Sequence, residues 1–419
     1  MARWLWLVGL ALVAACTYYD SSLLAPMNPG EPVGEGGEGG KGEGGASGDT
    51  GGFSGGEGGG SPGGEGGGGE VSGAAGASGG TGGVPYGTQT QIVNCAAKPI
   101  GPPKDKPVKT EGVSFVLAIR EVDFGETKIS GEFPYKGYGF DLDGACSCPD
   151  DFTCKGLDSD TSRYCDGPAG RDNAGGALVA SFSTLVPDCG SQSFNKAFSN
   201  GKSTLLIQID KYNGEPDDDQ VEVSWLLGEN LDNIGKPLWN GEDTWPVQTA
   251  SYVEDGAPPL RPKSTDKNAY VRGFVLVATL PNGSLESQGF SVNLTAPIMT
   301  ATLIPPRENQ PFWQVEDATM AARWRVQDLL GQLRRVNDPL SQKPLCTNNP
   351  FYPNIKAEIC KFADISSGVQ AQPNIPCDAI SVALKFKATQ CKLGKLIEVT
   401  PSDGLCSPET DPGKDSCGP

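Results

Sequence analysis

Two short segments carry the carboxylates of this chain whose spacing best suits metal chemistry. FDLDGACSC contains Asp141 and Asp143, and DNAGG contains Asp172 and Asn173. Oxygen ligands of this kind suit Ca²⁺, which takes about six to eight of them in relaxed geometry. The start D-x-D-G resembles an EF-hand loop, but Ala145 stands where that loop needs Asp or Asn. These four residues therefore form a candidate site for a structural calcium ion. In the alternative interpretation, Asp141 and Asp143 form Asx-turns in a solvated loop.

The cysteines predict disulfides. Twelve remain once Cys16 is set apart, an even number, and they fall into two groups of six separated by a long gap. We expect six disulfides, three within each group, with a pairing that spacing does not reveal. A four-thiolate metal site at the second to fifth of them is the alternative, but paired C-x-x-C knuckles are missing. The twelve are Cys95, Cys146, Cys148, Cys154, Cys165, Cys189, Cys346, Cys360, Cys377, Cys391, Cys406 and Cys417.

Composition excludes several classes of function. The chain has no histidine, so it has neither a Ser-His-Asp nor a Cys-His catalytic centre. Its net charge of −18 argues against a nucleic-acid partner. The GKS at 201–203 ends like a phosphate-binding loop, but Lys196 replaces the first glycine and a strand pattern follows, so we expect no nucleotide.

The first residues, MARWLWLVGLALVAAC, predict export. Residues 1–15 have the basic start and short apolar run of a signal peptide. The small residues before Cys16 resemble the lipobox of bacterial lipoproteins, which implies that Cys16 is acylated and that 16–29 is a lipidated N-terminus. By the same resemblance, Thr17 favours the outer membrane. We expect an exported protein, lipid-anchored to the periplasmic face or the cell surface.

Residues 30–83 predict a disordered tether rich in Gly and Glu. They hold 29 of the chain's 59 glycines and almost no apolar side chains, so nothing offsets the entropy of ordering them. A coil of this length spans roughly 40 Å.

The remaining chain predicts a mainly β body. Seven segments have strand patterns, and Asn213-Gly214 marks a hairpin between two of them. We expect an antiparallel β-sandwich, jelly-roll-like and stapled by disulfides, over 84–306. The expected strands are 113–121, 177–186, 203–210, 221–227, 269–280, 289–295 and 297–304.

After Pro306 the periodicity favours helices. Segments 317–336 and 352–365 repeat apolar residues at helical spacing, and 377–388 is a third candidate that also fits a strand. We expect 307–419 to be a Cys-rich helical region and tail, as a subdomain or an insertion.

Two loops add candidate binding residues. Trp239 and Trp245, with Asp243 between them, could stack against a sugar as exposed aromatics, or pack onto the sandwich instead. The acidic cluster at 217–219 favours a solvated hairpin tip.

The acidic and cysteine motifs resemble those of an uncharacterised family of secreted myxobacterial lipoproteins. The resemblance rests on G-Y-x-x-D-L-D-G-x-C from Gly137 to Cys146, on Gly170, Asp172 and Asn173, and on the hairpin 212–221. It covers roughly 130–420 and implies no activity.

The sequence thus predicts a non-catalytic, tethered envelope module with a binding or structural role. Its partners would be the membrane, through the lipid anchor, and a glycan or an envelope protein. The alternative is a polysaccharide hydrolase that works through two carboxylates, but no catalytic residue can be named.

Overall fold

The computed structural model describes residues 97–104, 112–146, 154–155, 165–183, 190–231, 235–253, 260–287, 290–338, 341, 343–369, 374–399 and 406–417. The predicted leader and tether lie outside this part of the chain, as do Cys16, Cys95, Cys148 and Cys189.

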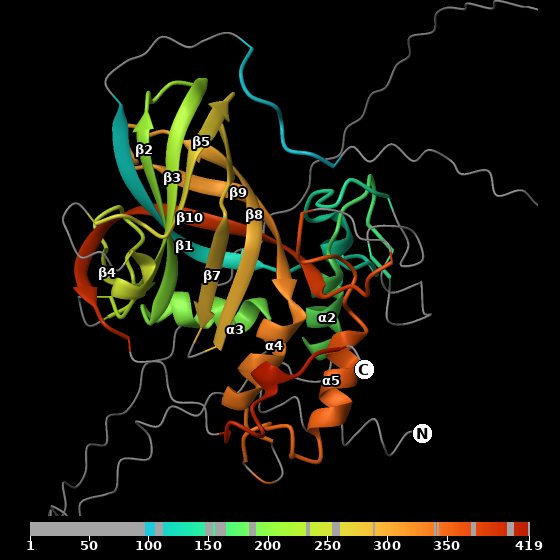
Figure 1. Cartoon of the computed structure of the whole chain (residues 1–419). Coiled ribbons are helices and arrows are strands. Elements are labelled where there is room, and N and C mark those ends of the chain that lie inside the picture. Colours follow the sequence, from blue (N-terminus) through green and yellow to red (C-terminus); the bar gives the residue numbers. More distant parts are fainter. Residues whose placement is uncertain are drawn as a thin grey trace, which may run out of the picture. The chain divides into compact units, whose positions relative to one another are not determined.

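The main sheet closes into an antiparallel barrel of eight strands (Figure 1). Around the barrel, each strand pairs antiparallel with the next, and the last pairs with the first. The predicted sandwich is therefore wrong, because pairing of β3 with β5 and of β1 with β10 leaves no open sheet. The strands are β1 (Val113–Asp123), β2 (Ser203–Tyr212), β3 (Asp218–Glu229), β5 (Ser264–Arg272), β6 (Val275–Thr279), β8 (Phe290–Ile304), β9 (Gln314–Arg325) and β10 (Ala379–Ile397).

Alternating apolar side chains fill the barrel interior. Leu205, Ile207 and Ile209 on β2 are buried in the main core, as the alternation of the sequence predicts. Phe115 on β1 stacks on Trp313 with 4.7 Å between ring centroids. An eight-stranded barrel is just wide enough for side chains to fill, so the lumen is a packed core.

Further elements lie outside the barrel. β4 (Thr244–Gln248) extends the sheet by pairing parallel to β10, and β7 (Asn282–Ser287) pairs with β8. α3 (Ser191–Ser199) contributes Phe198 to the main core. None of the helices in the described part of the chain is long and apolar enough to span a membrane. The other helical segments are α2 (Ala174–Ser183), α4 (Val326–Gln332), α5 (Tyr352–Cys360) and the short 3-10 turns η2 (Pro134–Gly137), η3 (Thr249–Ser251), η4 (Leu333–Arg335) and η5 (Pro412–Lys414).

Several predicted elements differ from the structure. Residues 177–183 of the strand expected at 177–186 belong to α2, and 184–186 lie outside the described residues. A short apolar run alone does not separate a buried helix from a strand. The segment 269–280 is not one strand but contributes to two, β5 and β6, joined at Gly273 and Phe274, both with positive φ. The two strands expected between 289 and 304 form one, β8, whose register shifts near Ala296.

The helical region predicted after Pro306 contains two barrel strands. Residues 317–325 belong to β9 and 379–388 to β10, and Ala318, Met320 and Ala322 face the main core. Because small apolar residues occupy both faces of these strands, their pattern imitates a buried helix. Helices do follow at α4 and α5, close to their predicted positions. The expected boundary at 306 falls between β8 and β9, which are neighbours in the barrel.

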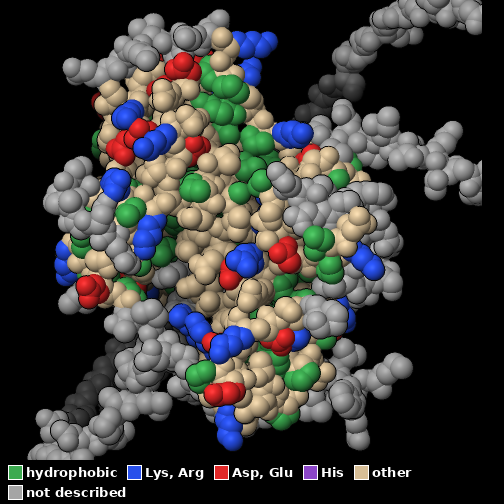
Figure 2. Space-filling view, viewed as in Figure 1, with side chains coloured by type: hydrophobic (Ala, Val, Ile, Leu, Met, Phe, Trp, Pro, Cys, Tyr) green, Lys and Arg blue, Asp and Glu red, His purple; other side chains and the backbone are tan. Residues whose placement is uncertain are grey.

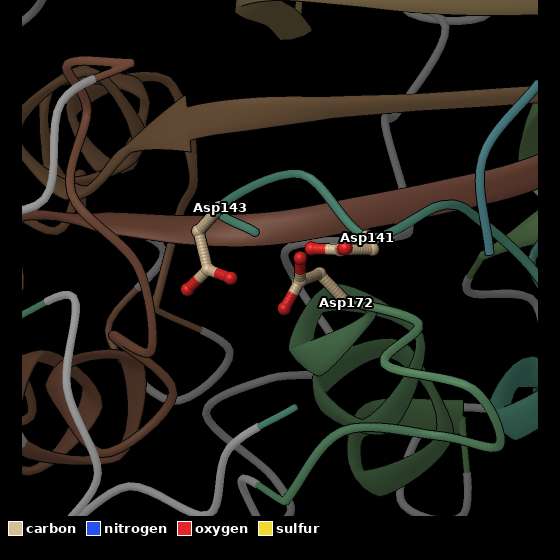
Figure 3. A group of neighbouring side chains, drawn as sticks. All are labelled: Asp141, Asp143 and Asp172. Carbon is tan, nitrogen blue, oxygen red and sulfur yellow. The ribbon is translucent and has the colours of Figure 1, made fainter. Parts of the chain in front are cut away.

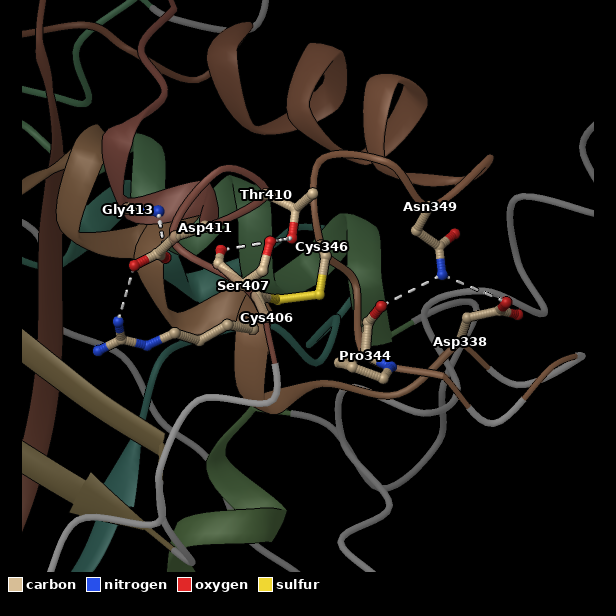
Figure 4. Close-up of a disulfide and its surroundings, with 10 residues drawn as sticks. Asp338, Pro344, Cys346, Asn349, Cys406, Ser407, Thr410, Asp411 and Gly413 are labelled. Atoms are coloured by element: carbon tan, nitrogen blue, oxygen red, sulfur yellow. Dashed lines mark hydrogen bonds and ion pairs between the residues drawn. A yellow bond between two sulfur atoms is a disulfide. The ribbon is translucent and has the colours of Figure 1, made fainter.

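The cysteines form disulfides, but not in two closed groups. Cys154 of the first group bonds Cys377 of the second, and Cys391 is a free, buried thiol. The prediction that all twelve cysteines are bonded is therefore wrong at Cys391. Two bonds fasten the C-terminal tail to the α5 region, and one of them is seen in Figure 4. They are Cys346–Cys406 and Cys360–Cys417, while Cys146 and Cys165 are also disulfide-bonded.

The segment 138–143 crosses the outside of the barrel over two small side chains. Phe140 packs in a separate apolar cluster with Ala321 of β9 and Ala383 of β10. Gly139, at φ +95°, comes so close that a Cβ there would lie 2.7 Å from Ala383 Cβ and 3.0 Å from the carbonyl oxygen of Asp172. Small residues on the barrel wall therefore let this loop lie flat against it.

We expect Gly139→Ala to lower the free energy of unfolding by about 2–5 kcal/mol, because a side chain at positive φ costs about 1–2 kcal/mol and overpacking about 1–3 kcal/mol. Gly137→Ala is the matched control, since a Cβ there meets nothing within 4 Å. Urea unfolding of both variants checks this. Equal stabilities would mean that the loop does not rest on Ala383.

Candidate metal centre

Three aspartates predicted from the sequence come together outside the barrel (Figure 3). One carboxylate oxygen from each of Asp141, Asp143 and Asp172 lies within 4.8 Å of the others. Asp141 and Asp143 come from the loop that crosses the barrel wall, and Asp172 precedes α2. Each of these loops also contains a disulfide-bonded cysteine, Cys146 or Cys165, so both are covalently restrained near the carboxylates.

Asp141 and Asp172 are both buried, and Asp141 has the carboxylate oxygen without a hydrogen bond. The Asp141 side chain is fully buried, and its Oδ1 accepts a hydrogen bond from the Gly144 N–H at 2.6 Å. Its Oδ2 accepts no hydrogen bond, and the charge facing it is the Lys98 ammonium at 3.9 Å. Burial, followed by repulsion from Asp143, raises the pKa of Asp141, whereas the Gly144 hydrogen bond and Lys98 lower it.

Asp172 connects the two loops. Its Oδ2 accepts from the Leu142 N–H at 2.6 Å, and its own N–H donates to the Phe140 carbonyl oxygen at 3.1 Å. Burial raises its pKa well above the ordinary value, and the charges of neighbouring carboxylates, Asp143 first, raise it further. A cluster of this kind gains from a bound cation, which would favour the ionised carboxylates.

Asp143 is only half-buried, and its Oδ1 accepts from the Ala145 N–H at 2.9 Å. Both Asp141 and Asp143 thus make local turn hydrogen bonds, as the alternative interpretation predicted. That interpretation is wrong about a solvated loop, since Asp141 is buried.

Asn173 uses its side chain in the fold. Its Oδ1 accepts from the N–H groups of Gly176 and Ala383, and its Nδ2 donates to the Tyr135 carbonyl oxygen. It therefore positions α2 against β10, next to Asp172, and its amide is occupied by these bonds.

A buried arginine and a fourth carboxylate lie near the aspartates and were not predicted. Arg323 of β9 is 3% exposed, and its Nη2 donates to the Leu142 carbonyl oxygen at 2.6 Å. Burial lowers its pKa, while Asp172, Asp143 and Asp364 raise it. The sequence signal was an arginine within the apolar run MAARWR, and the helical interpretation gave it no role.

Asp364 is the fourth carboxylate. It accepts hydrogen bonds from the N–H and hydroxyl of Ser381, whose Oγ in turn accepts from the Ala174 N–H that begins α2. Burial raises the pKa of Asp364 from 3.8 to about 7. It lies far from the acidic motifs in the sequence, and no local pattern marks it.

The two tryptophans do not form an exposed platform. Trp245 is fully buried and Trp239 is half-buried, with 6.2 Å between their ring centroids. Asp243 accepts hydrogen bonds from the N–H groups of Leu238 and Trp239. The loop packs onto the barrel, so the predicted sugar-stacking site at Trp239 and Trp245 is wrong.

The acidic hairpin tip is a structural turn. Asp218 is buried and accepts from the N–H groups of Asn213 and Gln220, while Asp217 accepts from the Gly273 N–H in the β5–β6 turn. The tip is therefore hydrogen-bonded to a neighbouring turn, and only Asp219 of the three remains an exposed carboxylate without such a bond among the described residues.

The surface outside the acidic cluster is mixed in charge. On the face seen in Figure 2, basic side chains lie beside acidic ones. Ion pairs of the described residues include Arg120 with Glu316 and Lys387 with Glu121. Two shallow hollows of about 440 and 390 Å³ lie elsewhere, and neither is lined by Asp141, Asp143 or Asp172.

Comparison of the chain with protein-family models, with curated proteins and with solved structures finds no match. The resemblance to myxobacterial lipoproteins therefore stays a prediction.

The raised pKa of Asp364 predicts a pH dependence of stability. The folded state keeps its proton up to about pH 7, whereas the unfolded chain releases it near pH 4, so this group lowers stability as the pH rises between the two. We expect Asp364→Asn to lose less stability than the wild type between pH 4.5 and 7.5, by a few kcal/mol at most, since one pKa unit corresponds to about 1.4 kcal/mol. Urea unfolding in EDTA across that range measures it, and parallel profiles would contradict the assignment.

Proposed function

We propose that this chain is an exported, lipid-anchored envelope protein that presents a β-barrel module on a tether, and that its acidic cluster holds a structural calcium ion. The module has a binding or structural role. The observation that carries the calcium site is the buried Oδ2 of Asp141, which accepts no hydrogen bond and adjoins two further carboxylates. The leader and tether rest on the sequence.

The donor set favours calcium over softer metals. All three side chains offer carboxylate oxygens, which are hard ligands, and the chain has no histidine. Cys146 and Cys165 nearby are bonded in disulfides, so they are not thiolate ligands. Hydrogen bonds already occupy one oxygen of each aspartate. The ion would therefore complete its shell with water, as calcium does at flexible sites.

Core side chains fill the interior of the barrel. This favours a module that binds its partners on the outer surface. The hydrolase alternative gains no support from the larger hollow. Of its two carboxylates, Glu229 already accepts a hydrogen bond from Gln248, and Glu398 lies beside Lys395 in the lining. A binding or structural role is the better account.

A thermal melt of the purified protein with excess calcium, and then with EDTA, tests the site. Calcium at about 100 times its dissociation constant should add about 2.7 kcal/mol, which raises the Tm by roughly 5 °C. Asp143→Asn should remove most of this shift without unfolding the protein, because Asp143 is only half-buried. Asp219→Asn, at the exposed hairpin tip, is the control and should keep it. No shift in the wild type would refute the calcium site.

The anchor is tested by Cys16→Ser. We expect this variant to move from the membrane fraction to the soluble exported fraction, because it lacks the acyl chains that contribute about 0.8 kcal/mol per buried methylene. Cys391→Ser, which removes the free thiol of the described residues, is the control and should stay with the membrane. Membrane association of Cys16→Ser equal to that of the wild type would contradict the anchor.

A further inference from the structure

A short segment, residues 97–101, links the acidic cluster to the barrel, and we name it the strap. It follows the Gly-rich segment in the sequence and begins the described part of the chain. Ala97 is buried. Its N–H donates to the Ala169 carbonyl oxygen at 3.1 Å, and its carbonyl oxygen accepts from the Asp141 N–H at 2.8 Å. Ala97 therefore joins the two loops that carry the three aspartates.

The other end of the strap is held by β5. The Tyr270 hydroxyl donates to the Ile100 carbonyl oxygen at 2.5 Å, and Arg272 Nη1 donates to the Gly101 carbonyl oxygen at 3.3 Å. The strap thus has two attachments, one on the metal-binding loops and one on the barrel.

Lys98 lies where a cation would compete with it. Its ammonium is 3.9 Å from Asp141 Oδ2, and its side chain is 65% exposed whereas that of Asp141 is fully buried. An exposed lysine is a weak counter-ion, and a divalent ion held by three carboxylates neutralises them better. Calcium would replace Lys98 at Asp141 while the backbone bonds of Ala97 remain.

We propose that calcium at Asp141, Asp143 and Asp172 fastens the strap, so that occupancy of this site controls how closely the tether is attached to the barrel. This rests on the calcium site proposed above. The ion draws the loops 138–144 and 165–172 together, and Ala97 is hydrogen-bonded to both. Without calcium, repulsion among the aspartates loosens the loops and releases this end of the strap. The three residues ahead of the β5 attachment, 97–99, released in extended form add about 10 Å to the reach of the tether.

Hydrogen exchange of the full chain, with calcium and with EDTA, tests this. The amides to follow are Ala97, which donates to Ala169, and Asp141, which donates to Ala97. In the wild type we expect calcium to slow exchange at both at least tenfold. Asp143→Asn should abolish the difference, and Asp219→Asn should keep it.

Lys98→Met tests the competition separately. It removes the internal counter-ion without touching the backbone bonds of Ala97, and it should lower the calcium concentration for half-maximal protection by about two- to fivefold. Lys361→Met, which removes a half-buried lysine paired with Glu358 of α5, is the control and should leave that concentration unchanged.

The outcomes separate the two proposals. Slowed exchange at Ala97 that depends on Asp143 supports the strap. A calcium-dependent Tm with unchanged exchange at Ala97 would overturn the strap and leave the calcium site standing. The absence of any calcium effect on either measurement would overturn both.

Discussion

The antiparallel pairing of β10 with β1 is the contact on which the rest of the molecule depends. It runs from Val116 opposite Cys391 to Asp123 opposite Lys385, and it joins strands from opposite ends of the body. Closure removes the open edges that a sheet must otherwise protect. The acidic loops and α2 lie on the outer wall formed by β9 and β10, which pair with each other, and β8 continues that wall. Ala321 and Ala383 have small side chains, so the backbone of the loop at Gly139 can pack closely against these strands.

Burying the aspartate carboxylates on the outside of the barrel costs desolvation free energy. Hydrogen bonds and one buried arginine offset part of that cost. Backbone N–H groups hydrogen-bond Asp141, Asp143 and Asp172, and Ser381 hydrogen-bonds Asp364. Arg323 brings one positive charge, held by the Leu142 carbonyl oxygen. Three carboxylates, Asp143, Asp172 and Asp364, act on this one buried guanidinium. Burial first, and repulsion from Asp143 after it, raises the pKa values of Asp141, Asp172 and Asp364. A divalent cation is the simplest species that would balance this negative charge.

The sequence predicted the structure correctly where a short-range pattern, such as strand alternation or a turn residue, determines the local conformation. Alternation in β2 and β3 follows from a sheet with one face in the core, and Asn213-Gly214 marks their hairpin correctly. Asp141, Asp143 and Asp172 could be grouped because each lies in a turn motif near a cysteine. By contrast, β9 has buried residues on both faces, which hides the period of two and favoured a helix. Whether a sheet closes into a barrel depends on which strands far apart in the sequence pair with each other, and no local sequence pattern predicts that pairing. Arg323 and Asp364 join the cluster through this closure alone, which is why they were missed.

The burial of Cys391 has a consequence for the covalent structure of the protein. Its thiol lies in a small apolar cluster on the outer wall with Trp245, Leu206 and Leu226, and burial raises its pKa. Thiol–disulfide exchange requires an accessible thiolate, so the native state keeps this sulfur from attacking the disulfides of the protein. The cover is the β4 segment, which pairs parallel to β10 and also pairs with β3 at Gly228 opposite Val247. Detachment of β4 would expose the Cys391 thiol and let it react as a nucleophile. The packing of this one short strand therefore also protects the disulfides from exchange.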